Sequence, residues 1–393
     1  MNKQPTALIP HITIFGKRNV GKSSLLNALA NQEVSLVHDT MGTTTDPVKK
    51  RMELIPFGPV IFIDTAGLDD VGELGSMRVK KSEHVMMQTD LALLVVDSNN
   101  IDDLFIENLE LKLKRRSIPS ILVFNKSDQV SEEELESLIH KYPKAIFVSA
   151  KNRDIEKLRS TLIKQLGEVK EPSIIGDQLK YGDVAILVCP IDSEAPKGRM
   201  ILPQVQVIRD LLDYGIQALV IRETELEHAL QITKNVAIVI TDSQAFHYVN
   251  QIVPDNIPLT SFSMLFARYK GDFNTLLQGA RFVDKLTPSS KILVVESCSH
   301  NISHEDIGQI KIPRLLEQKL GFKPQIDFCL GADFPSVIQG YDLIIHCGSC
   351  MLNRKTMKSR IEVANDLNIP MVNYGVLISY LTNILDRTTK VFC

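Results

Sequence analysis

Two short segments near the carboxyl end carry side chains that could bind a metal. They hold Cys298 and His300 in one segment, and His346, Cys347 and Cys350 in the other. Cys347 and Cys350 have the C-x-x-C spacing that lets two thiolates bind one metal ion or one corner of a cluster. The chemistry that we expect of these residues is therefore metal binding by thiolates.

An apolar run that predicts a buried strand precedes each of these segments. The two runs are residues 291–296 and 342–345. If both strands lie parallel in one sheet, their carboxyl ends open at the same edge, which is where α/β proteins bind ligands. We therefore expect Cys298 to meet Cys347 and Cys350 at this edge, although they are far apart in the sequence.

Two kinds of metal group are compatible with these residues. A structural zinc ion would take the three cysteines and either His300 or His346 in a closed tetrahedral site. A 4Fe-4S cluster would bind the three thiolates and leave its fourth iron to a histidine, another donor or an exchangeable ligand. A helix predicted from Arg354 follows the site, and its electropositive amino end suits an anionic cluster. Residue types alone leave the choice open, and each histidine, His304 included, could be a ligand, a donor to a ligand or a bystander.

The composition of the chain excludes several classes of protein. Its 393 residues are 44% hydrophobic and 23% charged, as in an ordinary globular protein. A formal net charge of −3 gives no electrostatic reason to expect nucleic acid or a membrane as a partner. Six cysteines are too few for a disulfide scaffold, and their grouping with histidines favours a reducing compartment. We see no signal peptide and no apolar run near the about 18 residues that span a bilayer, so we expect a cytoplasmic protein.

The first part of the chain carries a phosphate-binding loop. Apolar residues 11–15 predict a strand and residues 24–30 predict a helix. Residues 16–23 between them match G-x-x-x-x-G-K-S in full. In this context the backbone N–H groups of the loop cradle phosphates, the lysine reaches the β- and γ-phosphates and the serine binds Mg²⁺. The expected nucleotide contacts of this loop are Gly16, Gly21, Lys22, Ser23 and Ser24.

Three further motifs follow in the order that a GTPase requires. A predicted strand ends in the D-x-x-G motif, where Asp64 would hold Mg²⁺ through water and the Gly67 N–H would sense the γ-phosphate. The Asp128 carboxylate of the N-K-x-D box can accept two N–H bonds from guanine that adenine cannot offer. The four motifs together specify GTP rather than ATP. The other residues expected to bind the base are Asn125, Lys126 and the backbone of Ser149, Ala150 and Lys151.

In these motifs the chain resembles the TrmE–Era–EngA group of GTPases. The resemblance covers about residues 8–168 and is carried by residues 19–24, by Gly42, Thr43, Thr44 and Asp46, and by residues 64–67. In the switch I loop, residues 35–47, Thr44 is the candidate for contacting Mg²⁺ and the γ-phosphate, with Thr43 as the alternative. Lys22, Thr44 and Gly67 are therefore the expected catalytic residues.

The position after D-x-x-G predicts slow hydrolysis. Leu68 stands where Ras-like enzymes have the glutamine that orients water, and leucine cannot form that hydrogen bond. The family resemblance implies a compensating K⁺ ion, held partly by Asn19 and by switch I carbonyls. Such an ion would supply the positive charge that an arginine finger gives elsewhere.

A linker at Glu171-Pro172 ends the predicted GTP-binding domain, residues 1–170. A small α/β module follows over residues 171–262. So small a sheet has exposed edges, so we expect this module to form a homodimer by joining two sheets or packing helices across a twofold axis. Three buried strands are predicted in it, over 184–188, 218–221 and 236–240.

The third predicted domain is residues 263–393, again α/β. Residues 263–271 look like a connection. The fold class is thus α/β in three domains: a P-loop GTPase, a dimerisation module and a metal-binding domain. In the third domain we predict helices over 273–286, 313–320, 354–366 and 377–385, and strands over 291–296, 325–328, 342–345 and 371–373.

The combination of parts resembles the HydF family, the scaffold GTPases of FeFe-hydrogenase maturation. The resemblance rests on the GTPase motifs with residues 298–300 and 346–350, and it spans essentially the whole chain. It implies a 4Fe-4S cluster on three cysteines with a labile fourth site, and a dimer through the middle module. It also implies that the protein carries a transient diiron precursor. The radical-SAM partners HydE and HydG help to build this precursor, which passes to the apo-hydrogenase HydA.

A rival hypothesis comes from another class of protein. It is a K⁺-activated GTPase in RNA modification or ribosome assembly, with a binding module held together by zinc. Such a protein should present a basic face with aromatic residues in its carboxyl half. We find no such face in the sequence, which favours the first hypothesis.

Overall fold

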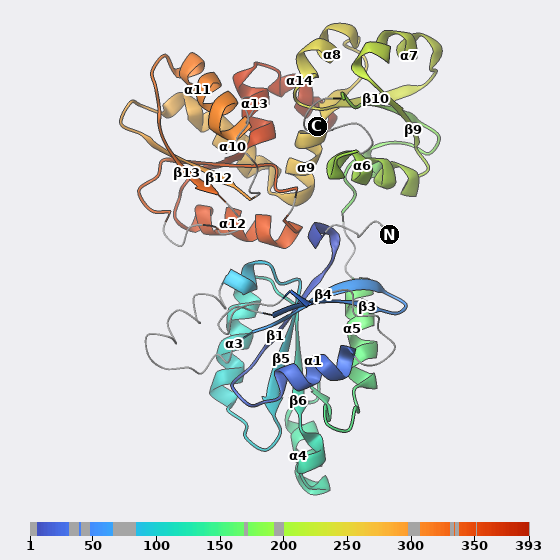
Figure 1. The fold of residues 1–393 in the computed structure, drawn as a ribbon, viewed down its shortest axis with the longest axis vertical. Helices are drawn as coiled ribbons and strands as arrows, with labels where there is room; N and C mark the ends of the chain where they lie inside the picture. The colour runs from blue at the N-terminus through green and yellow to red at the C-terminus, as the bar shows by residue number, and fades with distance from the viewer. Residues whose placement is uncertain are drawn as a thin grey trace. The chain divides into compact units, whose positions relative to one another are not determined.

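The computed structural model describes residues 6–30, 39–40, 48–65, 84–168, 172–191, 200–297, 307–330, 334, 338–350 and 352–392. The contacts between residues divide the chain into two compact units, Met1–Glu171 and Pro172–Cys393. Figure 1 shows the helices and strands of each unit. No helix within the described ranges is long and apolar enough to cross a bilayer.

The amino-terminal unit is built on one mostly parallel sheet, whose described strands follow the order β2-β3-β4-β1-β5-β6-β7. Helices α1 and α5 pack on one core with Leu25 and Leu158, and α3 packs on another with Leu109. The strands are β1 (His11–Phe15), β2 (Asp39–Thr40), β3 (Val48–Leu54), β4 (Gly58–Asp64), β5 (Leu91–Asp97), β6 (Ser120–Asn125) and β7 (Ile146–Phe147). The helices are α1 (Lys22–Ala30), α3 (Asp103–Arg115), α4 (Glu132–Lys141) and α5 (Glu156–Glu168).

The centre of this sheet places two predicted motifs side by side. Strand β1 lies between β4 and β5 and pairs parallel with both. Apolar runs such as Leu91–Val96 are buried because both faces of a parallel sheet are covered by helices. The phosphate-binding loop after β1 and Asp64 at the end of β4 therefore share one edge. The described part of this sheet also has three strands that were not predicted, β2, β3 and β5, and β3 is antiparallel to both β2 and β4.

Two parallel four-stranded sheets lie in the described part of the carboxyl-terminal unit, in the orders β11-β10-β8-β9 and β13-β12-β14-β15. We call them the middle sheet and the third sheet. The strands are β8 (Val184–Val188), β9 (Gln217–Ile221), β10 (Val236–Thr241), β11 (Leu259–Ser261), β12 (Lys291–Glu296), β13 (Gln325–Leu330), β14 (Leu343–His346) and β15 (Met371–Asn373). The helices are α6 (Leu202–Asp213), α7 (Leu226–Ile232), α8 (Phe246–Ile252), α9 (Phe262–Lys270), α10 (Phe273–Phe282), α11 (Ile312–Leu320), α12 (Arg354–Asp366), α13 (Tyr374–Leu381) and α14 (Leu385–Thr389).

The middle sheet differs from the prediction in two ways. It has a fourth described strand, β11, which pairs with β10 and is too short to show a pattern in the sequence. Strand β9 was predicted to be buried, but it is a half-exposed edge strand, and Val220 is 42% exposed. Apolar residues on an edge strand are indistinguishable in sequence from those of a central strand.

Residues 263–271, predicted to be a connection, belong almost entirely to helix α9. The Ser261 hydroxyl caps the helix by accepting the Met264 N–H at 3.3 Å. Leu265 packs in the core of the middle sheet, whereas Met264 and Ala267 pack in the core of the third sheet. A helix that is buried on two sides lacks the single apolar stripe by which a helix is predicted.

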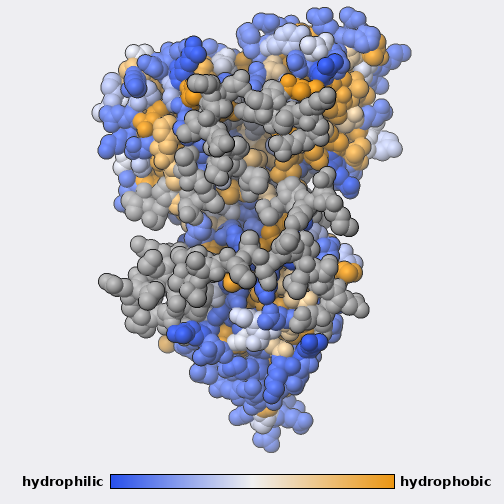
Figure 2. Space-filling view, in the orientation of Figure 1, coloured by the Kyte–Doolittle hydropathy of each residue, from blue (hydrophilic) through white to orange (hydrophobic). Residues whose placement is uncertain are grey.

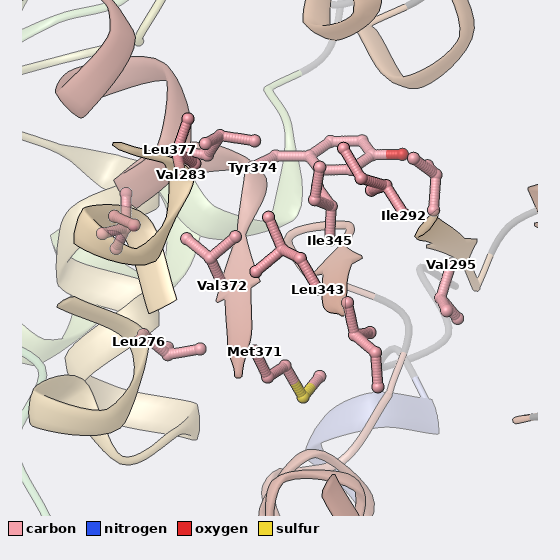
Figure 3. Packing of buried hydrophobic residues seen from close by; sticks show 14 of the residues in the cluster. Leu276, Val283, Ile292, Val295, Leu343, Ile345, Met371, Val372, Tyr374 and Leu377 are labelled. Carbon is pink, nitrogen blue, oxygen red and sulfur yellow. The ribbon is translucent and has the colours of Figure 1, made fainter. Parts of the chain in front are cut away.

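The third sheet carries α12 on one face and α10, α11 and α13 on the other (Figure 1). Apolar residues of its strands and helices interlock in one core (Figure 3). Helix α10 approaches β15 closely because of Gly279, where a Cβ would collide with the Met371 carbonyl oxygen. Helix α13 begins at Tyr374, not at the predicted residue 377, because the Asn373 side chain accepts the Val376 N–H at 2.9 Å.

Candidate functional site

The phosphate-binding loop connects β1 to α1. Helix α1 begins at Lys22, and the Leu25 N–H donates to the Gly21 carbonyl at 2.9 Å. Asn19 and Gly21 have positive φ angles of 60° and 90°, and a Cβ on Gly21 would collide with Nδ2 of Asn125. Only glycine fits this position. The loop thereby ends on the amino end of α1, where free N–H groups and the helix dipole favour phosphate.

The lysine and the serine of the loop have defined partners. Lys22 is 8% exposed, and its Nζ donates to the carbonyl oxygens of Gly16 at 3.1 Å and Lys17 at 2.7 Å. Ser23 Oγ donates to Asp64 Oδ2 at 2.6 Å. Residues from the first and second motifs therefore meet at the sheet edge.

The second oxygen of Asp64 suggests a cation site. Asp64 Oδ1 is buried and has no hydrogen-bond partner within the described residues. Burial raises the pKa of this carboxyl, while the hydrogen bond from Ser23 and the charges of Lys22 and Lys50 act in the opposite direction. Hydroxyl and carboxylate oxygens are the donors that Mg²⁺ prefers, and a cation there would compensate the buried negative charge. The residues present fit a Mg²⁺ ion.

The base-recognition motif presents an oriented carboxylate. Asp128 is exposed, and its Oδ1 accepts the Ser149 hydroxyl at 2.6 Å. Ser149 Oγ in turn accepts the Asn152 N–H at 3.1 Å. A carboxylate fixed on one side and open to solvent can accept the N–H groups of a bound base.

Asn125 of the same motif connects two loops. It is 2% exposed; its Nδ2 donates to the Val20 carbonyl at 2.9 Å, and its Oδ1 accepts the Ala150 N–H at 3.1 Å. The Ser149 N–H donates to the Asp154 carbonyl at 3.2 Å. Of the three N–H groups predicted to meet the base, that of Lys151 is the one without an acceptor in the described part of the chain.

Asp97 was not predicted as a site residue. It ends β5, and Lys126 Nζ lies 2.6 Å from its Oδ2, with Lys126 in a left-handed conformation at φ 64°. Burial acts to raise the pKa of Asp97, but hydrogen bonds from Lys126 and Asn99 outweigh it and the pKa is lowered. The ion pair fixes Lys126 beside the base-recognition loop. A single aspartate after an apolar run belongs to no motif, so no signal in the sequence marks it.

Several predicted site residues lie outside the described residues. In the GTPase motifs these are Thr43, Thr44 and Gly67, and in the metal site they are Cys298 and His300.

The third sheet confirms that the two predicted strands are parallel neighbours. Strands β12 and β14 pair directly, with Val295 opposite His346. The residue that follows β12, Ser297, donates its N–H to Cys347 Sγ at 3.3 Å. The end of the first strand therefore touches the first cysteine of the C-x-x-C motif.

Cys347 lies in a pocket of hydrogen-bond donors. Burial raises the pKa of its thiol, while hydrogen bonds from Ser297 and Ser349 act to lower it, and the nearby Cys350 acts to raise it. Backbone N–H donors to sulfur tune iron–sulfur sites and stabilise the thiolate once a metal replaces the proton. The environment of Cys347 therefore suits a metal-bound sulfur.

Both ring nitrogens of His346 have partners in the protein. His346 is fully buried; Nε2 lies 2.6 Å from Arg360 Nη1, and Nδ1 lies 2.9 Å from the Cys347 carbonyl oxygen. Because arginine can only donate, the proton must lie on Nδ1 and point at the carbonyl. Burial and then the Arg360 charge lower the pKa of His346 to about 3, so the ring is neutral. Neither nitrogen offers a lone pair to a metal in this arrangement, in which His346 contacts the segment between β14 and α12, residues 347–353, which we call the cysteine loop.

Arg360 places a buried charge between the two strand ends. It is 1% exposed, its Nη1 donates to Ser297 Oγ at 3.1 Å, and its guanidinium lies 5.3 Å from the centre of the Phe334 ring. A buried cation is costly to transfer from water and favours an anionic neighbour. Arg360 could not be singled out from the sequence, because one arginine in an amphipathic helix resembles a solvated one.

The cysteine loop is strained and tightly held. Ser349 has a φ of 55°, which costs a non-glycine residue about 1–3 kcal/mol unless its surroundings fix it. Its buried hydroxyl lies 3.1 Å from His346 Nδ1. Helix α12 begins at Arg354 as predicted, and the Asn353 side chain caps it by accepting the Thr356 N–H at 3.0 Å. The electropositive end of this helix follows the cysteines directly.

The described residues supply part of a metal site. They contain no group of three His, Cys, Asp or Glu side chains that could hold an ion. They do supply two thiols, N–H donors to sulfur and a buried cation, which fit an anionic group bound by thiolates. The third thiol expected here is that of Cys298, two residues beyond the end of β12.

The amino-terminal unit is similar to known GTPases. Residues 11–126 match the family model described as "50S ribosome-binding GTPase". The chain is 38% identical over 146 residues to the tRNA modification GTPase MnmE of Mycoplasma mycoides, covering 37% of this chain and 32% of that protein. It is 34% identical over 179 residues to the mitochondrial tRNA modification GTPase MSS1 of Saccharomyces cerevisiae, covering 41% and 33%. The chain thus spans about a third of the length of these relatives.

A solved structure was also matched. It is that of a variant of Aquifex aeolicus Era bound to GDP·AlF4⁻, with a TM-score of 0.34 and 17% identity, covering 58% of this chain and 99% of that one.

The carboxyl-terminal unit matches two models of one specific family. Residues 174–271 match "Hydrogen maturase F dimerization domain", and residues 274–391 match "Hydrogen maturase F tetramerization domain". With the GTPase match, the three models follow one another along nearly the whole chain. The fold is therefore a P-loop GTPase domain followed by dimerisation and tetramerisation domains, and the chain belongs to the hydrogen maturase F (HydF) family.

Proposed function

We propose that this protein is a GTP-hydrolysing scaffold that carries the diiron precursor of the FeFe-hydrogenase active site. In this proposal Cys298, Cys347 and Cys350 hold a 4Fe-4S cluster. The precursor, which HydE and HydG help to build, passes to the apo-hydrogenase HydA. The observation that supports it best is the bond from the Ser297 N–H to Cys347 Sγ. This bond places the residue just before Cys298 against the C-x-x-C motif, in a chain that belongs to the HydF family.

The proposed GTPase cycle uses the residues of the amino-terminal unit. Asp128 would accept the N–H groups of guanine, and Lys22 would move from loop carbonyls to the phosphates. Ser23 and Asp64 would hold Mg²⁺, which would neutralise charge on the phosphates. Thr44 and Gly67 keep their predicted roles as residues that sense the γ-phosphate.

Potassium is expected to accelerate GTP hydrolysis at least about tenfold over sodium at equal ionic strength. The physical reason is that Leu68 cannot orient water, so a monovalent cation near Asn19 would supply positive charge to the transition state. The measurement is phosphate release by the full-length protein in K⁺ and in Na⁺. Asn19→Ala should remove the difference between the salts. Equal rates in both salts for the wild type would exclude this role of Asn19.

Self-association is proposed to include pairing at the outer edge of β9. This strand is the last described strand of the middle sheet, and apolar side chains on it and at the end of α6 are exposed: Val220 is 42%, Leu212 60% and Tyr214 44% exposed. Figure 2 shows apolar surface over the middle module. An edge strand with exposed apolar neighbours is a template for a second strand, and these residues match a dimerisation domain.

The rival role in RNA modification receives support from the amino-terminal unit alone. The relatives named as tRNA modification GTPases match within about two-fifths of the chain. The matches over residues 174–391 are to the HydF family instead. A role in RNA modification or ribosome assembly is therefore the less favoured function.

Activation of apo-hydrogenase tests the proposed function. Protein purified from cells that also produce HydE and HydG should confer hydrogen evolution on apo-hydrogenase HydA, measured by gas chromatography. Protein purified from cells without HydE and HydG should confer none, because it lacks the diiron precursor. Absence of activity in both samples would contradict the carrier role.

A further inference from the structure

The last residue of α9 donates into the cysteine loop. Lys270 is 2% exposed, and its Nζ lies 2.7 Å from the Ser349 carbonyl oxygen, 2.9 Å from that of Leu352 and 3.4 Å from that of Cys350. An ammonium group has three donors and no acceptor, so these carbonyls can satisfy it. Lysine is almost never buried so completely unless its charge has partners. The loop that carries Cys350 is therefore wrapped around a buried positive charge.

A second bond joins α9 to the far end of the same loop. Arg354, the first residue of α12, donates its Nε to the Tyr269 carbonyl at 2.7 Å. Carbonyl groups at the carboxyl end of a helix have no partner within it and carry partial negative charge, which a guanidinium complements. The last turn of α9 thus holds both the loop and the helix that follows it.

Helix α9 is itself fixed by two cores. Leu265 and Tyr269 pack with the middle sheet, and Met264 and Ala267 pack with the third sheet. Its cap, Ser261, is the last residue of β11. Helix α9 therefore connects the core of the middle sheet to the cysteine loop, which it contacts through Lys270.

We propose that Lys270 is a positioning residue of the cysteine loop. Its ammonium group fixes the loop and places a positive charge beside the group bound by Cys347 and Cys350. The inference rests on the proposed function in taking these two cysteines as metal ligands. A nearby cation stabilises thiolates relative to thiols and favours the more negative state of a bound cluster. Removing the charge should therefore weaken metal binding and make a cluster harder to reduce.

Cobalt(II) is the probe for metal affinity, because thiolates bind it without iron–sulfur assembly and colour it. Lys270→Met keeps a long apolar side chain but lacks the charge and the donors. It should weaken Co²⁺ binding about tenfold or more, measured by titrating the visible absorbance of the full-length protein. Arg268→Met is the matched control, because that arginine lies on the same helix but donates to the Ile174 carbonyl at 3.0 Å. Its Co²⁺ affinity should stay within about twofold of the wild type.

The reduction equilibrium is the second readout. In anaerobically reconstituted protein, Lys270→Met should disfavour the reduced cluster about tenfold, which is about 59 mV for a one-electron couple. Loss of packing without loss of the charge gives no reason for the reduced cluster to become less favoured. The control Arg268→Met should leave the reduction equilibrium unchanged.

Unchanged Co²⁺ affinity and unchanged reduction in Lys270→Met would overturn the proposal. If this variant loses cooperative thermal unfolding, Lys270→Gln replaces it, since the amide keeps two donors without the charge. Equal Co²⁺ affinity of Lys270→Gln and the wild type would then overturn it as well. If the variant binds Co²⁺ more weakly but the protein never assembles an iron–sulfur cluster, the positioning role of Lys270 would be supported and the proposed function would be refuted.

Discussion

Replacement of Cys347 by serine is expected to abolish cluster binding. After anaerobic reconstitution, bound iron should fall from about four ions per chain to below one. The reason is that a serine hydroxyl stays protonated near neutral pH and is a poor ligand where a soft thiolate is needed. Iron and acid-labile sulfide analysis of the purified protein measures this. The same loss is expected for Cys350→Ser and for Cys298→Ser.

Cys189→Ser is the control for this experiment. Cys189 is half-buried against the core of the middle sheet, and burial, with a smaller effect of Asp242, raises the pKa of its thiol to about 12. A thiol held in its protonated form is a poor metal ligand. The variant should keep the iron of the wild type. If Cys347→Ser retained as much iron as Cys189→Ser, the C-x-x-C motif would not bind the cluster.

Replacement of Asp128 by asparagine is expected to lower GTP affinity about 100-fold. The carboxylate that accepts two N–H groups of guanine becomes an amide, whose own N–H₂ then faces the 2-amino group. One charge-assisted bond is lost and a donor is left unpaired, which together cost about 3 kcal/mol. Xanthine has a carbonyl in place of the 2-amino group, so xanthosine triphosphate should bind the variant better than GTP does. Titration with fluorescent nucleotide analogues measures both affinities.

Asp154→Asn is the matched control for Asp128→Asn. Asp154 is exposed and follows the same loop, and its backbone bonds to Ser149, which the substitution leaves in place. GTP affinity should stay within about twofold of the wild type. If Asp128→Asn bound GTP as tightly as this control, Asp128 would not recognise the base.

In the amino-terminal unit, local motifs predicted the strand and the helix that flank the phosphate-binding loop, but not the strands β2, β3 and β5. The glycines, Lys22 and Ser23 are close in sequence, and the strand before them and the helix after them fix where they lie. The contact of Ser23 with Asp64 follows from β1 and β4 being parallel neighbours. Such contacts are predictable because the positions at strand ends are set by the sheet topology.

The pairing of β12 with β14 was predictable for the same reason. Two apolar runs, each followed by cysteine, implied parallel strands that end at one edge, and the register places Val295 opposite His346. The role of His346 was not predictable. Its sequence position beside Cys347 left it open as a ligand, a donor to a ligand or a bystander, whereas its partner Arg360 comes from a helix that the sequence does not link to it.

Lys270 and α9 show where sequence patterns fail. Amphipathic patterns reveal a helix with one buried face, but α9 is buried by two cores, and its run 263–271 therefore resembles a connection. A lysine at the end of such a run resembles a solvated terminus. Its burial depends on carbonyl groups about eighty residues away, which no local pattern records.

The most direct test of the proposed cluster site is electron paramagnetic resonance of the reduced protein after anaerobic reconstitution with iron and sulfide. We predict brown protein and a reduced 4Fe-4S signal that disappears in Cys347→Ser and persists in Cys189→Ser. Colourless protein that binds one zinc ion per chain and gives no such signal would contradict a cluster bound by these cysteines.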